Sequence, residues 1–188
     1  RTSIPKCLSD KSKDEMIRFF GAYEAVFHKP MVNKYNNMNL YAHLIADALK
    51  TSFFICVTRD PVYLAQSLLR ARIDIHGNVS TPYGIHRHKE KESNSKNRDF
   101  VQDVCEQVLY HEEETRKQQQ IIGSERFWII SYEDFCKRPE ELVKRVSDQI
   151  LRQPIDIKKL REKLKPFDTA NTMKLEPQIF RKIQRILQ

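Results

Sequence analysis

Hydrophobic side chains recur every three to four positions in two stretches near the start of the chain, residues 14–26 and residues 38–49. That spacing places the apolar side chains on one side of an α-helix. The period changes at residues 52–58, a nearly continuous run of apolar, aromatic and β-branched residues. Such a run is typical of a strand that is buried on both faces of a parallel sheet. The pattern therefore predicts two helices followed by a buried strand.

A strong helix start follows this strand directly. Asp60 is a good N-cap, and Pro61 suits the first helical position because its missing N–H would have no partner there. We expect this helix to run to about residue 72. Polar residues, together with Gly, Pro and Ser, then fill residues 74–99, which predicts a long loop of the kind that forms lids or stays disordered.

The same alternation continues in the second half of the chain. A long helix is predicted over residues 99–120 and a second buried strand over residues 127–132, and Asp134 or Pro139 opens the next helix. Short buried strands that alternate with helices predict an α/β fold, a parallel sheet with helices on both faces and a helix-rich C-terminal part. Because two strands are few for such a fold, we expect further strands in weaker segments or outside this chain.

Composition narrows the class of protein. The 188 residues suit a single domain, 1–188, and the longest apolar run is too short for a membrane span. Only four glycines occur, and none belongs to a glycine-rich phosphate loop. The four cysteines are scattered without a CxxC pair, and the histidines show no paired ligand spacing. These features predict a cytoplasmic protein without a metal site.

The chain is basic, with a formal net charge of +8, and residues 151–188 contribute ten Lys or Arg against four Asp or Glu. This C-terminal excess suits nucleic acid, a membrane surface or a small polyanion. The solvated face of an amphipathic helix explains the same charges. No interleaved aromatic residues and no known nucleic-acid-binding motif accompany them, so a nucleic-acid-binding domain ranks last among the functions that we infer, and we expect no nucleic-acid partner.

Polar residues follow both predicted strands at the edge where α/β folds bind ligands. Arg59 comes directly after the first strand, Ser67 lies eight residues later, and Tyr132 ends the second strand. An arginine at a strand end beside a helical hydroxyl is suited to hold a phosphate monoester. Capping and ordinary strand-end chemistry explain the same residues, so the pattern alone leaves both interpretations open.

Three motifs along the chain resemble motifs of the PAPS-dependent sulfotransferases, and they occur in the same order as in that family. The stretch from Phe54 through Thr58-Arg59-Asp60-Pro61 to Ser67 is similar to their 3′-phosphate motif, and Tyr132-Glu133-Asp134-Phe135 is similar to their Tyr-Glu-Asp-Leu strand end. Upstream, Asn33-Lys34-Tyr35-Asn36 and the next helix resemble the segment in which a lysine precedes the first of these strands. The resemblance covers about residues 32–150 and implies a P-loop-NTPase-like fold.

The resemblance implies a role for four residues. Arg59 and Ser67 would hold the 3′-phosphate of the donor PAPS, Tyr132 would lie near its adenine, and Lys34 would be the catalytic cation beside the transferring sulfuryl group. The expected reaction is in-line transfer to a hydroxyl or amine of a small-molecule, carbohydrate or other acceptor, with PAP as the product and no metal. Fixed cations stabilise the negative charge that develops in such a transfer.

The chain departs from the family at two points. Asn36 stands where many members have a histidine base, and its amide cannot take a proton. Glu24 and His28 are upstream titratable groups that could serve as the base in its place. The family's loop for the 5′-phosphosulfate is missing, and we expect that loop and its strand to precede residue 1. A non-catalytic PAP-binding or interaction module of the same fold is therefore the alternative to an enzyme.

The resemblance also suggests contributions from less distinctive segments. In family members the C-terminal region supplies polar groups to the nucleotide, for which Asn171, Lys174 and the pair Arg181-Lys182 are candidates. Residues 74–99 correspond to the lid on the acceptor side. Basic side chains in this loop would favour an acidic or carbohydrate acceptor: His76, His86, Arg87, His88 and Lys89. A solvated loop explains them equally well.

Overall fold

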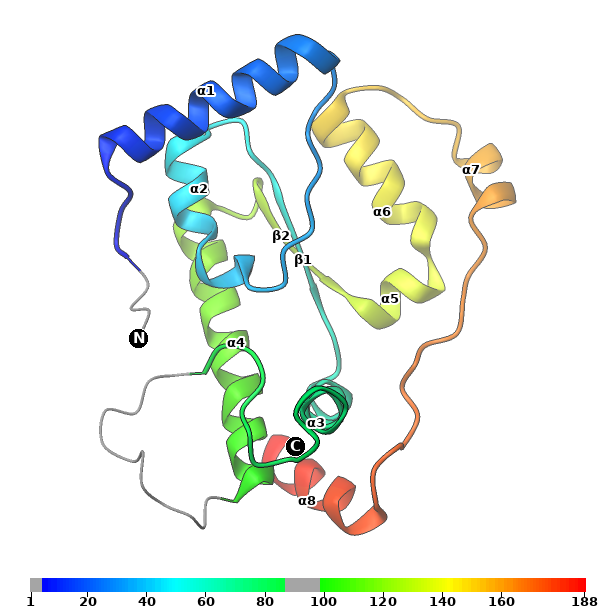
Figure 1. Ribbon diagram of the computed structural model, residues 1–188. Helices are drawn as coiled ribbons and strands as arrows, with labels where there is room; N and C mark the ends of the chain where they lie inside the picture. The colour runs from blue at the N-terminus through cyan, green and yellow to red at the C-terminus, as the bar shows by residue number, and fades with distance from the viewer. Residues whose placement is uncertain (1–4, 87–98) are drawn as a thin grey trace. The chain divides into compact units, whose positions relative to one another are not determined.

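A computed structural model describes residues 5–86 and 99–188 (Figure 1). The protein is α/β and helix-rich, with a small parallel sheet of two strands. The chain divides into two compact units, of which the first takes in residues up to Cys56 together with Glu113–Ile129 and the second takes in Val57–Glu112 and Ile130–Gln188. That these units form one sulfotransferase-like domain, 1–188, stays a prediction.

The first unit contains the two helices that the N-terminal pattern predicts. Helix α1 spans Asp10–Phe27 and begins where the Ser9 hydroxyl accepts the N–H of Ser12, four residues earlier than the hydrophobic pattern indicates. The second predicted helix is divided into a 3₁₀ turn, η1 (Met38–Leu40), and α2 (Ala42–Ala48). Tyr41 separates them because its backbone, with φ of −123°, leaves the helical region.

The sheet consists of β1 (Phe54–Thr58) and β2 (Phe127–Ser131), at the places where the sequence predicts strands. The prediction that these strands are buried on both faces is wrong for β1. Its side chains alternate in exposure, and Ile55 and Val57 are 39% and 53% exposed. Alternation of this kind means that one face of the strand is covered and the other is open in the part of the chain that the structure describes.

The second unit contains the helices that follow the strands. Helix α3 spans Pro61–His76, and α4 (Phe100–Ile122) begins in this unit. After β2 come α5 (Tyr132–Lys137), α6 (Pro139–Val146), the π-helical turn η2 (Ser147–Leu151), α7 (Ile157–Lys163) and α8 (Pro177–Leu187). Pro139 does open a helix, as predicted, but α5 begins at Tyr132 instead of Asp134, because the Ser131 hydroxyl caps it by accepting the N–H of Asp134.

The loop predicted over residues 74–99 begins later than expected, after His76. Helix α3 continues past residue 72 to His76 and ends where Gly77 adopts a left-handed conformation with φ of +71°. Glycine takes this conformation without the steric cost of a Cβ atom, so it ends the helix well. Arg87, His88 and Lys89 of the expected lid lie outside the described residues.

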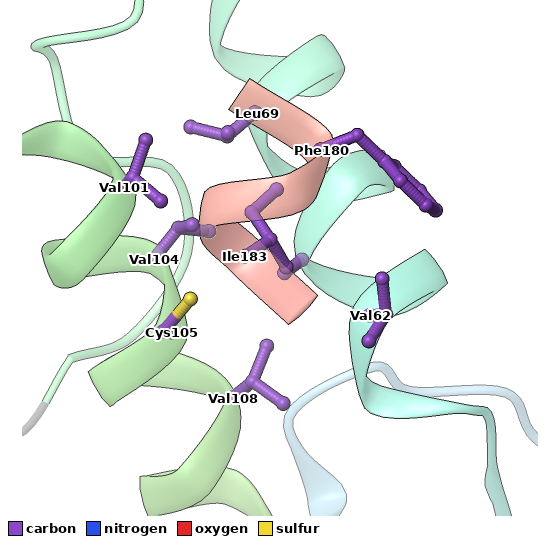
Figure 2. Packing of buried hydrophobic residues seen from close by; sticks show 9 residues of the cluster. Val62, Leu69, Val101, Val104, Cys105, Val108, Phe180 and Ile183 are labelled. Atoms are coloured by element: carbon purple, nitrogen blue, oxygen red, sulfur yellow. The ribbon is translucent and has the colours of Figure 1, made fainter. Parts of the chain in front are cut away.

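The core of the second unit is formed by α3, α4 and α8. Figure 2 shows Phe180 and Ile183 of α8 beside Val62 and Leu69 of α3, with the valines of α4 on the other side. Ile183 is fully buried, and Phe180 is 7% exposed. Burial of a large apolar side chain contributes roughly 1.5–3 kcal/mol, so these two residues hold the C-terminal helix against α3. The segment that precedes α8 is thereby fixed beside the polar residues of α3.

Candidate functional site

The carboxyl ends of β1 and β2 lie next to each other in the second unit. The Thr58 hydroxyl, at the last residue of β1, donates a hydrogen bond to the carbonyl oxygen of Ile130 over 3.2 Å. The residues that follow each strand therefore leave from the same edge of the sheet. This is the edge at which open α/β sheets bind ligands, as the sequence predicts.

Arg59, the first residue after β1, donates hydrogen bonds from all three of its guanidinium nitrogens. Nε donates to Oδ1 of Asn171 over 2.8 Å, Nη1 to Oγ of Ser67 over 3.1 Å, and Nη2 to the carbonyl oxygen of Ala170 over 2.7 Å. A guanidinium carries five N–H donors. One N–H on each terminal nitrogen is therefore left for a ligand, with no partner among the residues that the structure describes.

Helix α3 explains why Ser67 meets Arg59. The carboxylate of Asp60 accepts the backbone N–H of Val62 over 2.9 Å and that of Tyr63 over 3.4 Å, so the helix begins directly after the strand. Ser67 then lies within the second turn, on the side of the strand end. Because Asp60 already satisfies the helix N-terminus with a negative charge, an anion is better held by Arg59 and Ser67 than by the helix end.

The Ser67 hydroxyl accepts a hydrogen bond from Arg59 and has its own hydrogen left to donate. Among the described residues no acceptor for that hydrogen is found. A serine that accepts from a guanidinium and donates to a third group is suited to share an anion with that guanidinium. Arg59 and Ser67 thus provide N–H and O–H donors to one place.

Tyr132 belongs to the same group of residues. Its ring lies under the guanidinium, with 5.1 Å between Cζ of Arg59 and the ring centroid. Its hydroxyl accepts the backbone N–H of Ala170 over 3.1 Å. A cation above an aromatic ring at this distance is attracted by roughly 0.5–2 kcal/mol. The structure therefore places Tyr132 against Arg59, whereas its expected contact with an adenine stays a prediction.

Glu133 is a member of this site that the sequence did not single out. Its Oε1 accepts hydrogen bonds from Nδ2 of Asn171 over 2.7 Å and from the backbone N–H of Asp60 over 3.1 Å, and its Oε2 accepts one from the Ser131 hydroxyl over 3.0 Å. Burial pushes the pKa of this carboxyl up, but the hydrogen bonds from Asn171, Asp60 and Ser131 outweigh it and the pKa is lowered. We call Arg59, Ser67, Tyr132, Glu133 and Asn171 the Arg59 cluster.

Asn171 comes from the segment before α8, which Gln66 ties to α3. The Gln66 side chain is 2% exposed; its Nε2 donates to the Thr172 carbonyl over 2.8 Å, and its Oε1 accepts the Lys174 N–H over 2.6 Å and the Leu175 N–H over 3.3 Å. We call residues 170–175 the strap. Of the C-terminal candidates, only Asn171 contacts Arg59 through its side chain: Lys174 is exposed, and Lys182 forms an ion pair with Asp99.

The predicted catalytic cation belongs to the first unit. Lys34 lies exposed in the segment between α1 and η1, as do Tyr35 and Asn36. Glu24 and His28 are exposed at the end of α1, where the left-handed His28 donates its N–H to the Glu24 carbonyl and closes the helix. The role of Lys34 stays a prediction.

The expected acceptor side is described as far as Ile85 and His86. Gln107 of α4 donates to the carbonyl oxygens of Tyr83 and Ile85, and Nε2 of His111 lies 2.9 Å from the Ile85 carbonyl. Nδ1 of His86 lies 4.0 Å from the Asp103 carboxylate. These contacts hold the stretch after α3 against α4. They leave open the prediction that the stretch contacts an acceptor.

Two other kinds of feature are absent from the described residues. No helix there is long and apolar enough to cross a membrane. Within residues 5–86 and 99–188, no group of three His, Cys, Asp or Glu side chains is arranged to hold a metal ion.

Comparison with protein-family models, with curated proteins and with solved structures finds no match to this chain. Function is consequently inferred from the Arg59 cluster and from the sequence resemblance.

Proposed function

We propose that this chain is a PAPS-dependent sulfotransferase domain and that the Arg59 cluster holds the 3′-phosphate of the donor. The observation that supports this most is the meeting of Arg59 and Ser67, whose Nη1 and Oγ atoms are 3.1 Å apart. Each keeps at least one hydrogen to donate. A phosphate monoester with two negative charges accepts several such charge-assisted hydrogen bonds at once.

Neighbouring contacts support the same ligand. Three hydrogen bonds and the ring of Tyr132 fix the plane of the guanidinium before any ligand arrives. A fixed fork loses little side-chain entropy when it binds a phosphate. In the proposed complex the outer face of Tyr132 and the strap are the surfaces nearest to the ribose and adenine of the donor.

The proposed reaction moves a sulfuryl group from PAPS to a hydroxyl or amine. The acceptor oxygen or nitrogen forms a bond to sulfur as the bond from sulfur to the bridging phosphate oxygen breaks, which releases PAP; the acceptor's proton leaves to a base. Lys34 is the proposed cation beside the leaving oxygen. The Arg59 cluster binds the donor away from the reacting atoms, so its contribution is binding and orientation.

A non-catalytic PAP-binding module is the second candidate, and the side chain of Asn36 favours it. An amide cannot accept a proton at neutral pH, and no other base is identified near Lys34 in the sequence motif. Both candidates bind PAP and differ in turnover. Incubation with ³⁵S-labelled PAPS and a panel of hydroxyl acceptors separates them: labelled product supports the enzyme, and tight PAP binding without transfer supports the module.

The binding test compares two ligands that differ by a single phosphate. PAP and AMP share the adenosine and the 5′-phosphate, so the AMP dissociation constant divided by the PAP dissociation constant isolates the contribution of the 3′-phosphate. Two or more hydrogen bonds from Arg59 to a charged group contribute about 3 kcal/mol, so Arg59→Ala is expected to reduce this ratio about 100-fold. Calorimetric titration measures both constants.

The matched control is Arg70→Ala, because Arg70 is an exposed arginine of the same helix as Ser67. This variant removes the same charge and is expected to keep the ratio of wild type. If wild type binds PAP and AMP equally, the proposed function is wrong. Equal loss of PAP affinity in both arginine variants would mean that only the net charge of the chain attracts the nucleotide.

A further inference from the structure

We propose that Glu133 is a positioning residue for Arg59 and acts through the amide of Asn171. This inference rests on the proposed function, since it concerns the 3′-phosphate site of the same nucleotide. It assigns the site a carboxylate that never contacts the ligand. Its observable consequence is that loss of Glu133 weakens binding of the 3′-phosphate and of no other part of the nucleotide.

The carboxylate of Glu133 is held on three sides. Its three hydrogen-bond donors come from the strap, from the start of α3 and from the start of α5: Asn171 over 2.7 Å, the backbone of Asp60 over 3.1 Å and Ser131 over 3.0 Å. These segments are far apart in the sequence and all lead into the Arg59 cluster. Such a carboxylate has little freedom to move.

The amide of Asn171 transmits this order to the guanidinium. A carboxylate can only accept hydrogen bonds and a guanidinium can only donate them. The amide between them must therefore turn its NH₂ group to Glu133 and its Oδ1 to Arg59, as the distances of 2.7 Å and 2.8 Å have it. If the amide rotated by 180°, its NH₂ group would face the N–H of Arg59 and its oxygen would face the carboxylate of Glu133. Neither pair can form a hydrogen bond, so one orientation is strongly favoured.

An intervening amide has an advantage over a direct ion pair. A carboxylate bound directly to Arg59 would take up two N–H donors in a bidentate fork and neutralise the cation. Among the ion pairs of the described residues, none involves Arg59. Glu133 thus fixes the Nε side of the guanidinium through a neutral group and leaves an N–H on each terminal nitrogen for the phosphate.

The decisive experiment measures, for Glu133→Met, the ratio of the AMP dissociation constant to the PAP dissociation constant. Methionine has a similar length and cannot accept the hydrogen bond from Asn171. We expect the ratio to fall about tenfold, with AMP affinity close to that of wild type. In an Arg59→Ala background the same substitution should leave the ratio unchanged, because Glu133 then has no guanidinium to position.

Other outcomes separate a positioning role from a merely structural one. Equal weakening of PAP and AMP in Glu133→Met, or a further fall of the ratio in the Arg59→Ala background, would overturn the inference while leaving the proposed function intact. A wild-type ratio near one would overturn both. Glu141→Met, which removes an exposed carboxylate of α6, is the control and should keep the wild-type ratio.

A second variant covers the case in which Glu133→Met does not fold. Asn171→Ala removes the relay itself at a position that is only partly buried in the strap. It should lower the ratio of the AMP dissociation constant to the PAP dissociation constant by a similar factor. An unchanged ratio in Asn171→Ala, with a collapsed ratio in Arg59→Ala, would show that Arg59 needs no relay and would overturn the inference.

Discussion

The strap depends on one buried side chain, which makes Gln66 the most informative residue for stability. We consider Gln66→Met, which keeps the length of the side chain and removes its hydrogen bonds to Thr172, Lys174 and Leu175. Gln66 is 2% exposed, so water cannot easily replace these bonds. At about 1 kcal/mol for each well-formed bond, and less for the 3.3 Å contact with Leu175, we expect a loss of about 2–3 kcal/mol.

Urea denaturation measures this loss. A loss of 2–3 kcal/mol with an m-value of about 2–3 kcal/mol/M lowers the midpoint by about 1 M. Hydrogen exchange should show the same effect locally, because the amides of Lys174 and Leu175 lose their acceptor. PAP affinity should fall as well, since the strap carries the Asn171 and Ala170 acceptors of Arg59.

Gln102→Met is the matched control, because Gln102 is exposed on α4 and its side chain donates only to Glu106 within the same helix. We expect it to change the free energy of unfolding by less than about 0.5 kcal/mol. An equally small effect of Gln66→Met, or a Lys174 amide that keeps its protection, would contradict the expected loss. Either result would mean that the strap is held without the Gln66 amide.

Two further predictions concern the core of the second unit. Ile183→Ala removes a fully buried side chain of α8 and should lower the free energy of unfolding, measured by urea denaturation, by about 2–4 kcal/mol. Ile75→Ala, at an exposed position of α3, is the control and should change this free energy little. A small loss for Ile183→Ala would mean that α8 does not pack as in Figure 2. Burial, with smaller effects of Asp99 and Glu106, raises the pKa of Cys105 to about 11, so native labelling at pH 8 should modify exposed Cys7 and spare Cys105. Because the unfolded thiol ionises near pH 9, the stabilisation from this raised pKa is complete below about pH 9 and is lost as the pH rises towards 11. If the free energy of unfolding of a Cys105→Ala variant falls with pH above 9 as steeply as that of wild type, this explanation is wrong.

Local signals in the sequence predicted the elements that carry the site. A run of apolar residues followed by Asp60-Pro61 specifies a strand that turns directly into a helix, because capping and backbone preference act over a few residues. The eight-residue spacing then places Ser67 beside Arg59, because Arg59 directly follows the strand and Ser67 lies in the second turn of the helix that begins two residues later. The resemblance added a role for these residues that spacing alone left open.

The surroundings of Arg59 were decided by tertiary structure. Asn171 lies 112 positions along the chain from Arg59, and Glu133 lies 73 positions from Asp60. No periodicity and no helix cap in the sequence predicts contacts between residues so far apart. They meet because α8 packs against α3 and Gln66 of α3 binds the strap that leads into α8. The open face of β1 has the same explanation, because burial of Ile55 and Val57 depends on which segments cover the strand.

The sequence by itself determined that a cation would stand at a strand end beside a helical hydroxyl, because that arrangement needs only local geometry. Tertiary structure decided how the cation is held: by an amide, a carboxylate and an aromatic ring from segments that the chain brings together only when its core packs. Ordering distant residues costs conformational entropy, so hydrogen bonds between them form only when burial of the core offsets that cost. For that reason the sequence indicates Arg59, whereas the contacts that hold its guanidinium follow from the fold.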